Sequence, residues 1–347
     1  MTAYQAQALR YQGALAVLRH VHAHPGVSRA EMARALELSS GSATEITTRL
    51  KADSLLAEDA PAPTGGRGRP SPRLVAHPHG PLACLVDIGY DRWRVAVAEL
   101  GGRTTECASA PLQRRDPAAA ISAVAAKTTA ARRRFGGRIR AVSVAVAATV
   151  RGDRIVQGSS FGWRDVSLSP LRSRGLPLLV GNDATLAGMA EARRGAGAGV
   201  RRLLHIAVEA GVGGALVVDG MPVNDGEFGH LPFGDPARRC PCGAYGCWER
   251  EVTGAGAARA LGRGLGGLVN ALDPDAVTLS GPDLVGKELR SSYRSGLMRF
   301  YRKDPPPLIA SSLGADGRLV GAAEVAFDNI LTVEGIAHAT VSDRLSR

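Results

Sequence analysis

"GEFGHLPFGDPARRCPCGAYGCWE" occupies residues 226–249. Within it, His230 is followed after ten residues by Cys240. Cys242 and Cys247 come two and then five residues later. Three thiolates and one imidazole make a closed tetrahedral ligand set for zinc, which leaves no position for a reacting water. We therefore expect these four residues to bind a structural zinc ion (Zn). The alternative is a group of free thiols that only pack in a core.

The number of cysteines supports a metal site in a reducing compartment. The chain has five cysteines among 347 residues, and three of them lie in this one loop. An odd number this small does not make a disulfide scaffold. The sequence has no run of 18 apolar residues and no basic-then-apolar segment at its start, so we expect a cytoplasmic protein with no membrane partner.

Apolar runs alternate with helical patterns on both sides of the cysteine loop. This alternation predicts an α/β fold with mostly parallel sheets. The part after residue 80 is long for one core, so two lobes with a cleft between them are expected. The predicted strands are "LACLVDI", "RWRVAVAEL", "AVSVAVAA", "PLLVG", "LLHIAVEA", "GGALVVDG", "AVTLS" and "PLIASS". The predicted helices cover 116–134, 184–194, 251–263 and 283–303.

The first 79 residues read as a separate domain, 1–79, ahead of a second domain, 80–347. The segment 59–81 is dense in Pro and Gly and is typical of a turn-rich connector. Before it the pattern is helical. A first helix over 5–23 places five apolar residues near one face: Leu9, Ala14, Leu15, Leu18 and Val21.

Two further helices follow Pro25-Gly26 in this domain. Ser28 and Glu31 have the spacing of a capping box, which starts the second helix. After a short turn, a third helix over 42–53 would bury Ala43, Ile46 and Leu50. Two short helices joined by such a turn form a helix-turn-helix, whose second helix fits the major groove of DNA. The following extended "LLAE" favours the winged variant. A plain three-helix bundle is the alternative.

The outward side of the third helix predicts a DNA-binding surface. Short polar side chains there can reach base edges, and an arginine can reach guanine or phosphate. The expected DNA-contacting residues of this helix are Ser42, Thr44, Glu45, Thr48 and Arg49. In the connector, Arg67 and Arg69 flank Gly68 and precede Pro70, so we expect them to enter a narrow minor groove. A flexible basic linker is the alternative.

The net charge of +11 also favours a polyanionic partner. However, residues 1–80 hold nine Lys/Arg and six Asp/Glu, so the excess over this part is only three charges. An arginine-rich composition without functional meaning explains the charge equally well.

The chain resembles the ROK family of repressors, open reading frames and sugar kinases over nearly its whole length. The resemblance is carried by the His–Cys-x-Cys-Gly-x-x-Gly-Cys-x-Glu signature of 230–249, by "LLVGNDATLAGMAEARRGAG", by "EAGVGGALVVDGMPVNDGEFGH" and by "LDPDAVTLSGP". It implies a two-lobed, actin-like (sugar kinase-like) α/β domain that closes on a sugar. The N-terminal winged helix-turn-helix is typical of the repressor branch of this family.

The resemblance also implies the sugar-binding residues. These are Asn182, Asp183, Glu227, His230 and Glu249. In the kinases of the family, the residue that matches Asp183 is the general base, and a carboxylate facing a cleft can take a hydroxyl proton or accept its hydrogen bond. The local alternative for Asn182-Asp183 is a helix cap. One ring nitrogen of His230 would bind zinc and the other would face the ligand or a carboxylate. Ser160 departs from the family, which often has Asn near that position.

Both phosphate-binding segments depart from the kinase pattern. The first reads Asp87-Ile88-Gly89-Tyr90-Asp91, where the family has Asp-x-Gly-Gly-Thr. The second places Glu209 and Ala210 where kinases have Gly-Thr. Added bulk and negative charge oppose a nucleotide's phosphates. We therefore expect no enzymatic activity.

These observations favour a transcriptional regulator, expected to be a repressor, that binds a double-stranded DNA operator and senses a sugar or sugar derivative. Reading a palindromic operator implies a homodimer or tetramer. Two alternatives stay open. One is an ATP-dependent sugar kinase with an accessory DNA-binding head. The other is a ligand-free regulator controlled by a protein partner.

Overall fold

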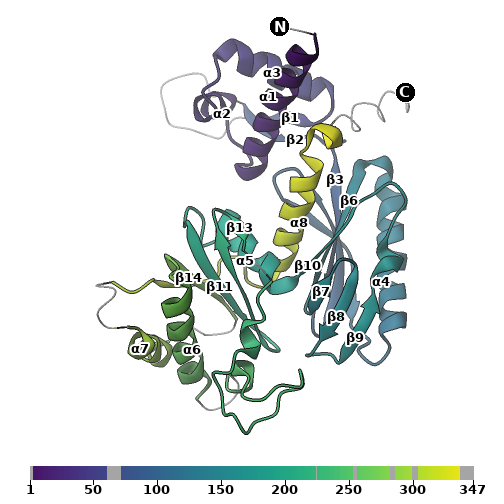
Figure 1. Cartoon of the computed structure of the whole chain (residues 1–347). Helices are drawn as coiled ribbons and strands as arrows, with labels where there is room; N and C mark the ends of the chain where they lie inside the picture. Colours follow the sequence, from purple (N-terminus) through teal and green to yellow (C-terminus); the bar gives the residue numbers. More distant parts are fainter. Residues whose placement is uncertain are drawn as a thin grey trace.

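The computed structural model shows a small N-terminal unit on top of two α/β lobes (Figure 1). It describes residues 3–60, 72–223, 225–252, 256–281, 286–298 and 304–336, and for residues 3–11 it describes the backbone only.

The N-terminal unit, called the head below, consists of three helices and a two-stranded antiparallel sheet. The helices are α1 (Ala3–Ala23), α2 (Arg29–Ala35) and α3 (Ser40–Ala52), and the strands are β1 (Leu56–Asp59) and β2 (Arg73–Ala76). The predicted capping box is confirmed, because the Ser28 hydroxyl accepts from Glu31 N and the Glu31 side chain accepts from Ser28 N. The strand β2 corrects the predicted connector. It pairs antiparallel with β1, so residues 73–76 of the predicted connector form the second strand of a β-hairpin.

The buried residues of α1 and α3 follow the predicted pattern, except at one position of α3. Ala14, Leu15, Leu18 and Val21 are buried, whereas the side chain of Leu9 lies outside the described residues. In α3, Thr47 is fully buried and Ile46 is only partly buried. The Thr47 hydroxyl donates to Ala43 O at 2.8 Å, which satisfies the polar atom inside the core.

The first lobe has a five-stranded sheet of order β10-β6-β3-β4-β5. Its strands are β3 (Leu82–Ile88), β4 (Arg92–Glu99), β5 (Thr104–Pro111), β6 (Ile139–Val146) and β10 (Leu178–Asn182). The helix α4 (Pro117–Phe135) covers one face, and a small sheet of β7 (Thr149–Arg151), β8 (Arg154–Gly158) and β9 (Trp163–Ser167) lies beside it (Figure 1). The predicted helix 116–134 is confirmed as α4.

The second lobe repeats this plan with the order β13-β12-β11-β14-β15. Its strands are β11 (Arg202–Val208), β12 (Val212–Val218), β13 (Met221–Pro222), β14 (Ala276–Ser280) and β15 (Leu308–Ala310). The helix α5 (Asp183–Arg194) packs on one face, and α6 (Ala257–Leu272) with α7 (Lys287–Gly296) packs on the other. The predicted helix 184–194 is confirmed. The other two are corrected: α6 begins and ends later than 251–263, and the described part of 283–303 is helical only over 287–296.

The expectation of mostly parallel sheets is wrong. In each of the two five-stranded sheets, two strand pairs are parallel and two are antiparallel. The reason is the length of the connections. Only 89–91 separate β3 from β4, and only 209–211 separate β11 from β12, and so short a loop joins antiparallel neighbours only.

The helix α8 (Gly317–Ile330) joins the three parts of the molecule and was not predicted from the sequence. It packs on β3 and β6 of the first lobe, lies against α5, and ends at the head (Figure 1). Its contact with α5 is backbone to backbone. A Cβ atom at Gly321 would lie 2.0 Å from Leu186 O, so only glycine permits this approach.

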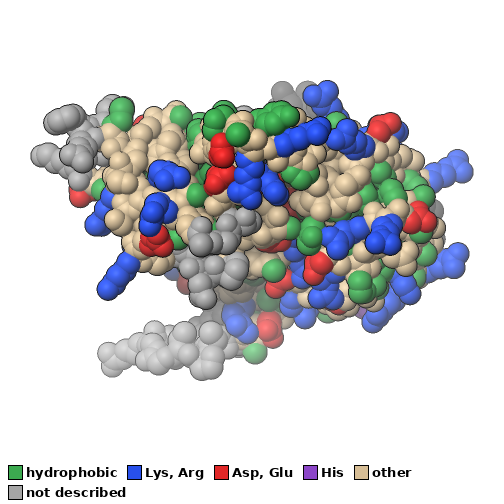
Figure 2. Space-filling model, turned by 90° about the horizontal axis from the view of Figure 1, so that it is seen from below, with side chains coloured by type: hydrophobic (Ala, Val, Ile, Leu, Met, Phe, Trp, Pro, Cys, Tyr) green, Lys and Arg blue, Asp and Glu red, His purple; other side chains and the backbone are tan. Residues whose placement is uncertain are grey.

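The surface of the lobes carries basic side chains outside the head. Figure 2 views the end of the molecule away from the head and shows Lys and Arg side chains spread over it among acidic and hydrophobic ones. A spread of this kind fits a basic composition better than one dedicated patch. Among the described helices, none is both long and apolar enough to span a membrane.

Candidate functional site

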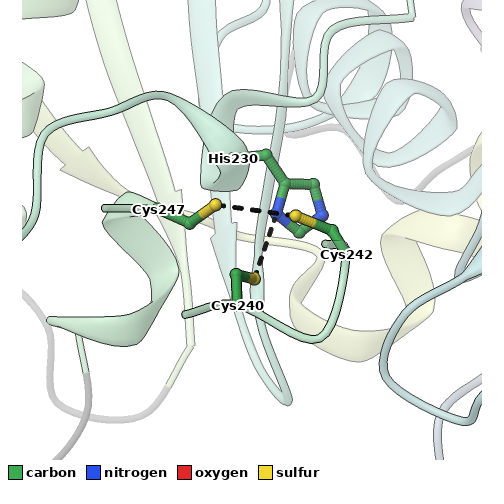
Figure 3. A group of neighbouring side chains, drawn as sticks. All are labelled: His230, Cys240, Cys242 and Cys247. Atoms are coloured by element: carbon green, nitrogen blue, oxygen red, sulfur yellow. Dashed lines mark hydrogen bonds between the residues drawn. The ribbon is translucent and has the colours of Figure 1, made fainter. Parts of the chain in front are cut away.

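The four predicted metal ligands lie together in the loops that surround η3 (Phe228–His230) and η4 (Trp248–Arg250) (Figure 3). Their ligand atoms all lie within 4.8 Å of one another. Cys242 Sγ is 3.6 Å from Cys247 Sγ, and Cys240 Sγ is 3.7 Å from His230 Nδ1. A zinc tetrahedron with Zn–S near 2.3 Å has edges of about 3.5–3.8 Å. The donor set therefore fits a metal ion, with Nδ1 as the ring nitrogen that faces it.

Metal binding at this site depends on whether the cysteine thiols are protonated. Burial raises the pKa of Cys240 and of Cys247 above the ordinary thiol value. Without a cation the thiols therefore hold their protons at neutral pH, and a metal that binds must release them. The second ring nitrogen, His230 Nε2, points to Glu227 Oε2 at 3.9 Å. The two ring nitrogens of His230 thus face a cysteine thiol and a carboxylate that lines the cleft.

A cleft opens beside the metal loop, between the two lobes. All five sugar-binding residues implied by the family line it: Asn182, Asp183, Glu227, His230 and Glu249. Ser160, at the position where the family often has Asn, lines it as well. The structure thus brings together residues that are up to 89 positions apart in the chain, from Ser160 to Glu249.

Asn182 and Asp183 begin α5 at the end of strand β10. Asn182 Oδ1 accepts from Thr185 N at 3.0 Å, and its Nδ2 donates to Ala148 O at 3.2 Å. The helix-cap interpretation is therefore confirmed for Asn182. Burial raises the pKa of Asp183 to about 6, against the opposing effect of Arg318. A carboxyl group with this pKa can accept a proton near neutral pH.

Two glutamates close the far side of the cleft. The Thr149 hydroxyl, on the first lobe, donates to Glu227 Oε1 on the second. Glu249 lies over the backbone at Gly211, where an added Cβ would meet its carboxylate at 2.7 Å. Glycine at 211 thus leaves room for the Glu249 carboxylate at the edge of the cleft.

The first phosphate segment is a tight turn whose carboxylate is already paired. Gly89 N donates to Arg92 O at 2.9 Å. Asp87 is almost fully buried and accepts from Arg94 Nε at 3.1 Å. Tyr90 lines the cleft, and the Arg114 guanidinium covers its ring at 4.6 Å. Asp91, by contrast, is not among the residues that line the described cleft, so the expected effect of its charge on a ligand is weakened.

Arg318, on the first turn of α8, extends its side chain toward both phosphate segments. Its guanidinium lies 3.6 Å from Asp87, 3.8 Å from Asp183 and 3.1 Å from Glu209. It also lies 3.1 Å from the position that a Cβ would take at Gly89. The positive charge of Arg318 therefore compensates the negative charge expected at Glu209.

Sequence reasoning did not find Arg318 or Arg94. Arg318 lies more than 100 residues after Glu209 and outside every family motif. Arg94 could have been found, because it faces Asp87 across the β3–β4 hairpin. A cross-strand acid–base pair at the end of a hairpin is a recognisable signal.

The predicted DNA-contacting residues of α3 lie on its outer side. Ser42, Thr44, Glu45 and Thr48 are exposed, and Arg49 is partly buried. Two hydroxyls are engaged locally: Thr44 Oγ1 donates to Ser40 O at 2.8 Å, and Ser42 Oγ lies 2.9 Å from Ser39 Oγ. Arg67 and Arg69 lie outside the described residues, in the chain between β1 and β2.

Relatives of known function fall into two groups. A glucokinase of Streptomyces coelicolor is 26% identical over 315 residues, which cover 71% of this chain and 97% of the glucokinase. The DNA-binding transcriptional repressor Mlc of Escherichia coli is 25% identical over 256 residues, which cover 70% of this chain and 63% of Mlc.

Solved structures share the fold. A ROK family glucokinase from Streptomyces griseus, in complex with glucose and AMPPNP, matches with a TM-score of 0.63 at 24% identity, over 71% of this chain and 99% of its own. A ROK family transcriptional regulator, a homologue of Escherichia coli Mlc, matches with a TM-score of 0.69 at 19% identity, over 96% of this chain and 99% of its own.

The family model of ROK proteins matches residues 83–260, which is just over half of the chain. This range contains both phosphate segments, Asn182-Asp183, Glu227 and the whole cysteine loop. The chain belongs to the ROK family.

Proposed function

We propose that this protein is a DNA-binding transcriptional regulator, acting as a repressor, whose operator affinity responds to a sugar or sugar derivative in the cleft. The observation that supports the proposal is the head, in which the two short helices α2 and α3 are separated by residues 36–39 and followed by the β1–β2 hairpin. We interpret α2 and α3 as a helix-turn-helix. The exposed polar side of α3 suits a major groove, and the hairpin suits a wing. We place the boundary between the two domains, 1–79 and 80–347, after this hairpin.

The coverage of the related structures supports the head as the part that separates this chain from the sugar kinases. The structure that matches 96% of this chain is a ROK family transcriptional regulator, whereas the glucokinase of Streptomyces griseus matches 71%. We assign the DNA contacts to Ser42, Thr44, Glu45, Thr48 and Arg49, with Arg67 and Arg69 in the minor groove. A homodimer or tetramer would present two heads to a palindromic operator.

The cleft supports sugar binding without phosphoryl transfer. Hydroxyl groups of a sugar pair with carboxylate, amide and imidazole groups, and Asn182, Asp183, Glu227, His230 and Glu249 offer these at the cleft. Arg318 lies at both segments that the family resemblance implies for a nucleotide's phosphates, and Asp87 is paired with Arg94. A magnesium ion at Asp87 would have to compete with two guanidinium groups.

The proposed cofactor is one structural zinc ion, bound by His230, Cys240, Cys242 and Cys247. Four protein ligands would close its coordination sphere. The ion would fix the loop that carries His230 and Glu249 against the cleft. A sugar could then contact residues whose positions the metal holds.

Titration of labelled duplex DNA from the region upstream of the protein's own gene, at several salt concentrations, tests this proposal. We expect affinity for that duplex to fall steeply with salt and to exceed the affinity for a scrambled duplex. Equal, weak binding of both duplexes would overturn it. Calorimetry with D-glucose and N-acetyl-D-glucosamine then tests the cleft, and no heat with any sugar of a wider panel would favour a regulator controlled by a protein partner.

A sugar kinase is the second candidate, because the raised pKa of Asp183 suits a general base and a glucokinase is among the relatives. Release of ADP from ATP that depends on D-glucose, and is lost in Asp183→Asn, would establish it. We expect no such release.

A further inference from the structure

We propose that α8 transmits the state of the cleft to the head, through Arg318 on its first turn and Glu324 further along the same helix. The proposal rests on the proposed function, since it describes how a ligand in the cleft would change the DNA-binding unit. The two residues are six positions apart, which corresponds to about 9 Å along a helix. One rigid element thus touches both sites.

At the cleft end, one guanidinium bridges three carboxylates from different parts of the molecule. Arg318 faces Asp87 of the first lobe, Asp183 at the start of α5 and Glu209 of the second lobe. It is only 12% exposed. Two buried atoms that face each other here, Arg318 Nε and Asp87 Oδ1, have no hydrogen-bond partner among the described residues. The arrangement is therefore paired in charge but incompletely hydrogen-bonded, which leaves it open to rearrangement.

A ligand in the cleft must interact with this arrangement. Asp183 and Glu209 line the cleft and are the carboxylates that a sugar's hydroxyl groups would approach. A hydroxyl that donates to either carboxylate competes with Arg318 for the same oxygen atoms. Occupation of the cleft therefore changes the pairing of Arg318, and this difference between the two states is what a ligand needs to shift an equilibrium.

The helices α8 and α5 are closely packed, and a hydrogen bond links α5 to the chain just before α8. Gly321 packs against the backbone of Leu186. The buried Glu191 of α5 accepts from Leu313 N at 3.0 Å, just before α8, and from Ala196 N at 2.8 Å. Close-packed interfaces of this kind shift between discrete arrangements and do not deform continuously.

At the end of α8 near the head, the buried carboxylate of Glu324 lies close to three basic side chains. It faces His22 Nε2 of α1 at 3.3 Å, Arg194 Nε of α5 at 2.5 Å and Arg193 Nη1 at 3.4 Å. The side chains of His22 and Glu324 are 8% and 5% exposed. A shift of α8 therefore alters a contact that the head cannot replace with water at low cost.

His22 links the head to the first lobe as well. Its Nδ1 accepts from Gly101 N at 3.0 Å, in the turn between β4 and β5, so the proton of the neutral ring is on Nε2. Nε2 lies 3.3 Å from Glu324 Oε1 but makes no hydrogen bond with the described residues. Its ring also stacks on Phe327 of α8 with centroids 4.6 Å apart. Nearby, Arg19 of α1 donates to Leu331 O at 2.9 Å, at the end of α8. The orientation of the head is thus set by α8 and one turn of the first lobe.

A double-mutant cycle on the full-length protein tests the coupling without a known ligand. Operator affinity is measured by fluorescence anisotropy for the wild type, Arg318→Gln, Glu324→Gln and the double variant. We expect the double variant to differ from the product of the two single effects by at least about 5-fold in Kd, because coupled residues are not additive. Arg259→Gln, which breaks the exposed Arg259–Glu288 pair at 3.0 Å, is the matched control and should combine additively with Glu324→Gln. Additive behaviour of Arg318→Gln within about 2-fold would overturn the inference.

Hydrogen exchange separates failure of this inference from failure of the proposed function. If the wild type shows no operator-specific binding, the regulator proposal fails, and the coupling is still tested on the free protein. Arg318→Lys keeps the charge but not the guanidinium fork, so it suits this measurement if Arg318→Gln does not fold. We expect faster amide exchange over 12–23 of α1 in Arg318→Lys than in Arg259→Lys. Unchanged exchange in α1 would contradict the inference.

Discussion

Arg318 Nη1 lies 3.1 Å from Glu209 Oε2, and this pair lies at the two segments that the family resemblance implies for phosphate binding. The same guanidinium approaches Asp87 and Asp183. The three carboxylates outnumber this one cation, and Arg94, the second cation at Asp87, is shared with Asp316. We therefore expect a nucleotide's phosphates to meet the Arg318 side chain and a group of residues with no net positive charge.

This arrangement makes a prediction about restoring nucleotide binding. Tyr90→Gly with Asp91→Thr rebuilds the family pattern of the first phosphate segment, but we expect ATP to bind more weakly than about 1 mM in calorimetry. The reason is that Arg318 still covers Gly89. Adding Glu209→Gly, Ala210→Thr and Arg318→Ala should produce measurable heat. Strong ATP binding by the first pair alone would show that Arg318 is not a barrier.

The raised pKa of Asp183 predicts a pH dependence of stability. Its pKa is about 6 in the folded protein, against about 3.9 in an unfolded chain. Because the folded pKa is the higher one, the folded state binds the extra proton. The stabilisation from this group is complete below about pH 4 and is lost as pH rises through about 6, amounting to at most about 3 kcal/mol.

Asp183→Asn isolates this effect. Urea denaturation at several pH values between 4 and 7 should show the free energy of unfolding of the variant rising relative to the wild type as pH increases. The side chain is 17% exposed, so solvent should reduce the effect only partly. A difference between the two proteins that stays constant with pH would contradict the assigned pKa.

The sequence predicted the parts of the site that depend on local spacing. His230 and the three cysteines are tied to one loop, and Asn182-Asp183 follow directly from a strand into a helix. Such features need only a short stretch of chain to define their geometry. The family resemblance then predicted that they share one cleft, and all five residues that it implies for sugar binding line the cleft.

Elements defined by distant contacts were not predictable in the same way. Nothing near Arg318 in the sequence indicates that α8 returns to the first lobe and faces Asp87. Strand β5 is mostly exposed or half-buried, so it lacks the apolar alternation that reveals a strand. Strand β2 is four residues long and follows a Pro/Gly-rich segment, which hides it.

The crossing of α5 and α8 predicts a strong effect of one added methyl group. Gly321→Ala would place Cβ 2.0 Å from Leu186 O, a backbone atom that cannot turn aside. We expect the free energy of unfolding to fall by about 1–3 kcal/mol, as for other overpacked cores. Gly137→Ala is the control, because no atom lies within 4 Å of its added Cβ. It should change stability by less than about 0.5 kcal/mol. Equal effects of the two variants would show that the helices separate easily.

The metal loop predicts a specific loss on removal of one thiol. Cys240→Ser should lower zinc content from about one ion per chain to a small fraction, because thiolate is a ligand and the alcohol is not ionised. Plasma mass spectrometry of protein purified without chelators measures this, and limited proteolysis of 231–247 reports the loss of loop structure. Cys107→Ser is the control, since Cys107 lies outside the cluster. Wild-type protein free of zinc, with Cys240→Ser folding normally, would refute the metal assignment.

If the head binds DNA as proposed, a substitution on the exposed side of α3 should lower the affinity for the operator and leave the fold unchanged. Thr48 is exposed and carries no charge. Thr48→Ala should weaken binding to the specific operator by about 1–2 kcal/mol and leave non-specific binding and its salt dependence unchanged. Arg49→Ala should instead reduce the salt slope by about one if Arg49 contacts phosphate. Thr129→Ala, at an exposed position of α4, is the control and should leave both quantities unchanged. If Thr48→Ala and Thr129→Ala bind the operator equally well, α3 does not read bases at position 48, and the recognition surface must be sought elsewhere on the head.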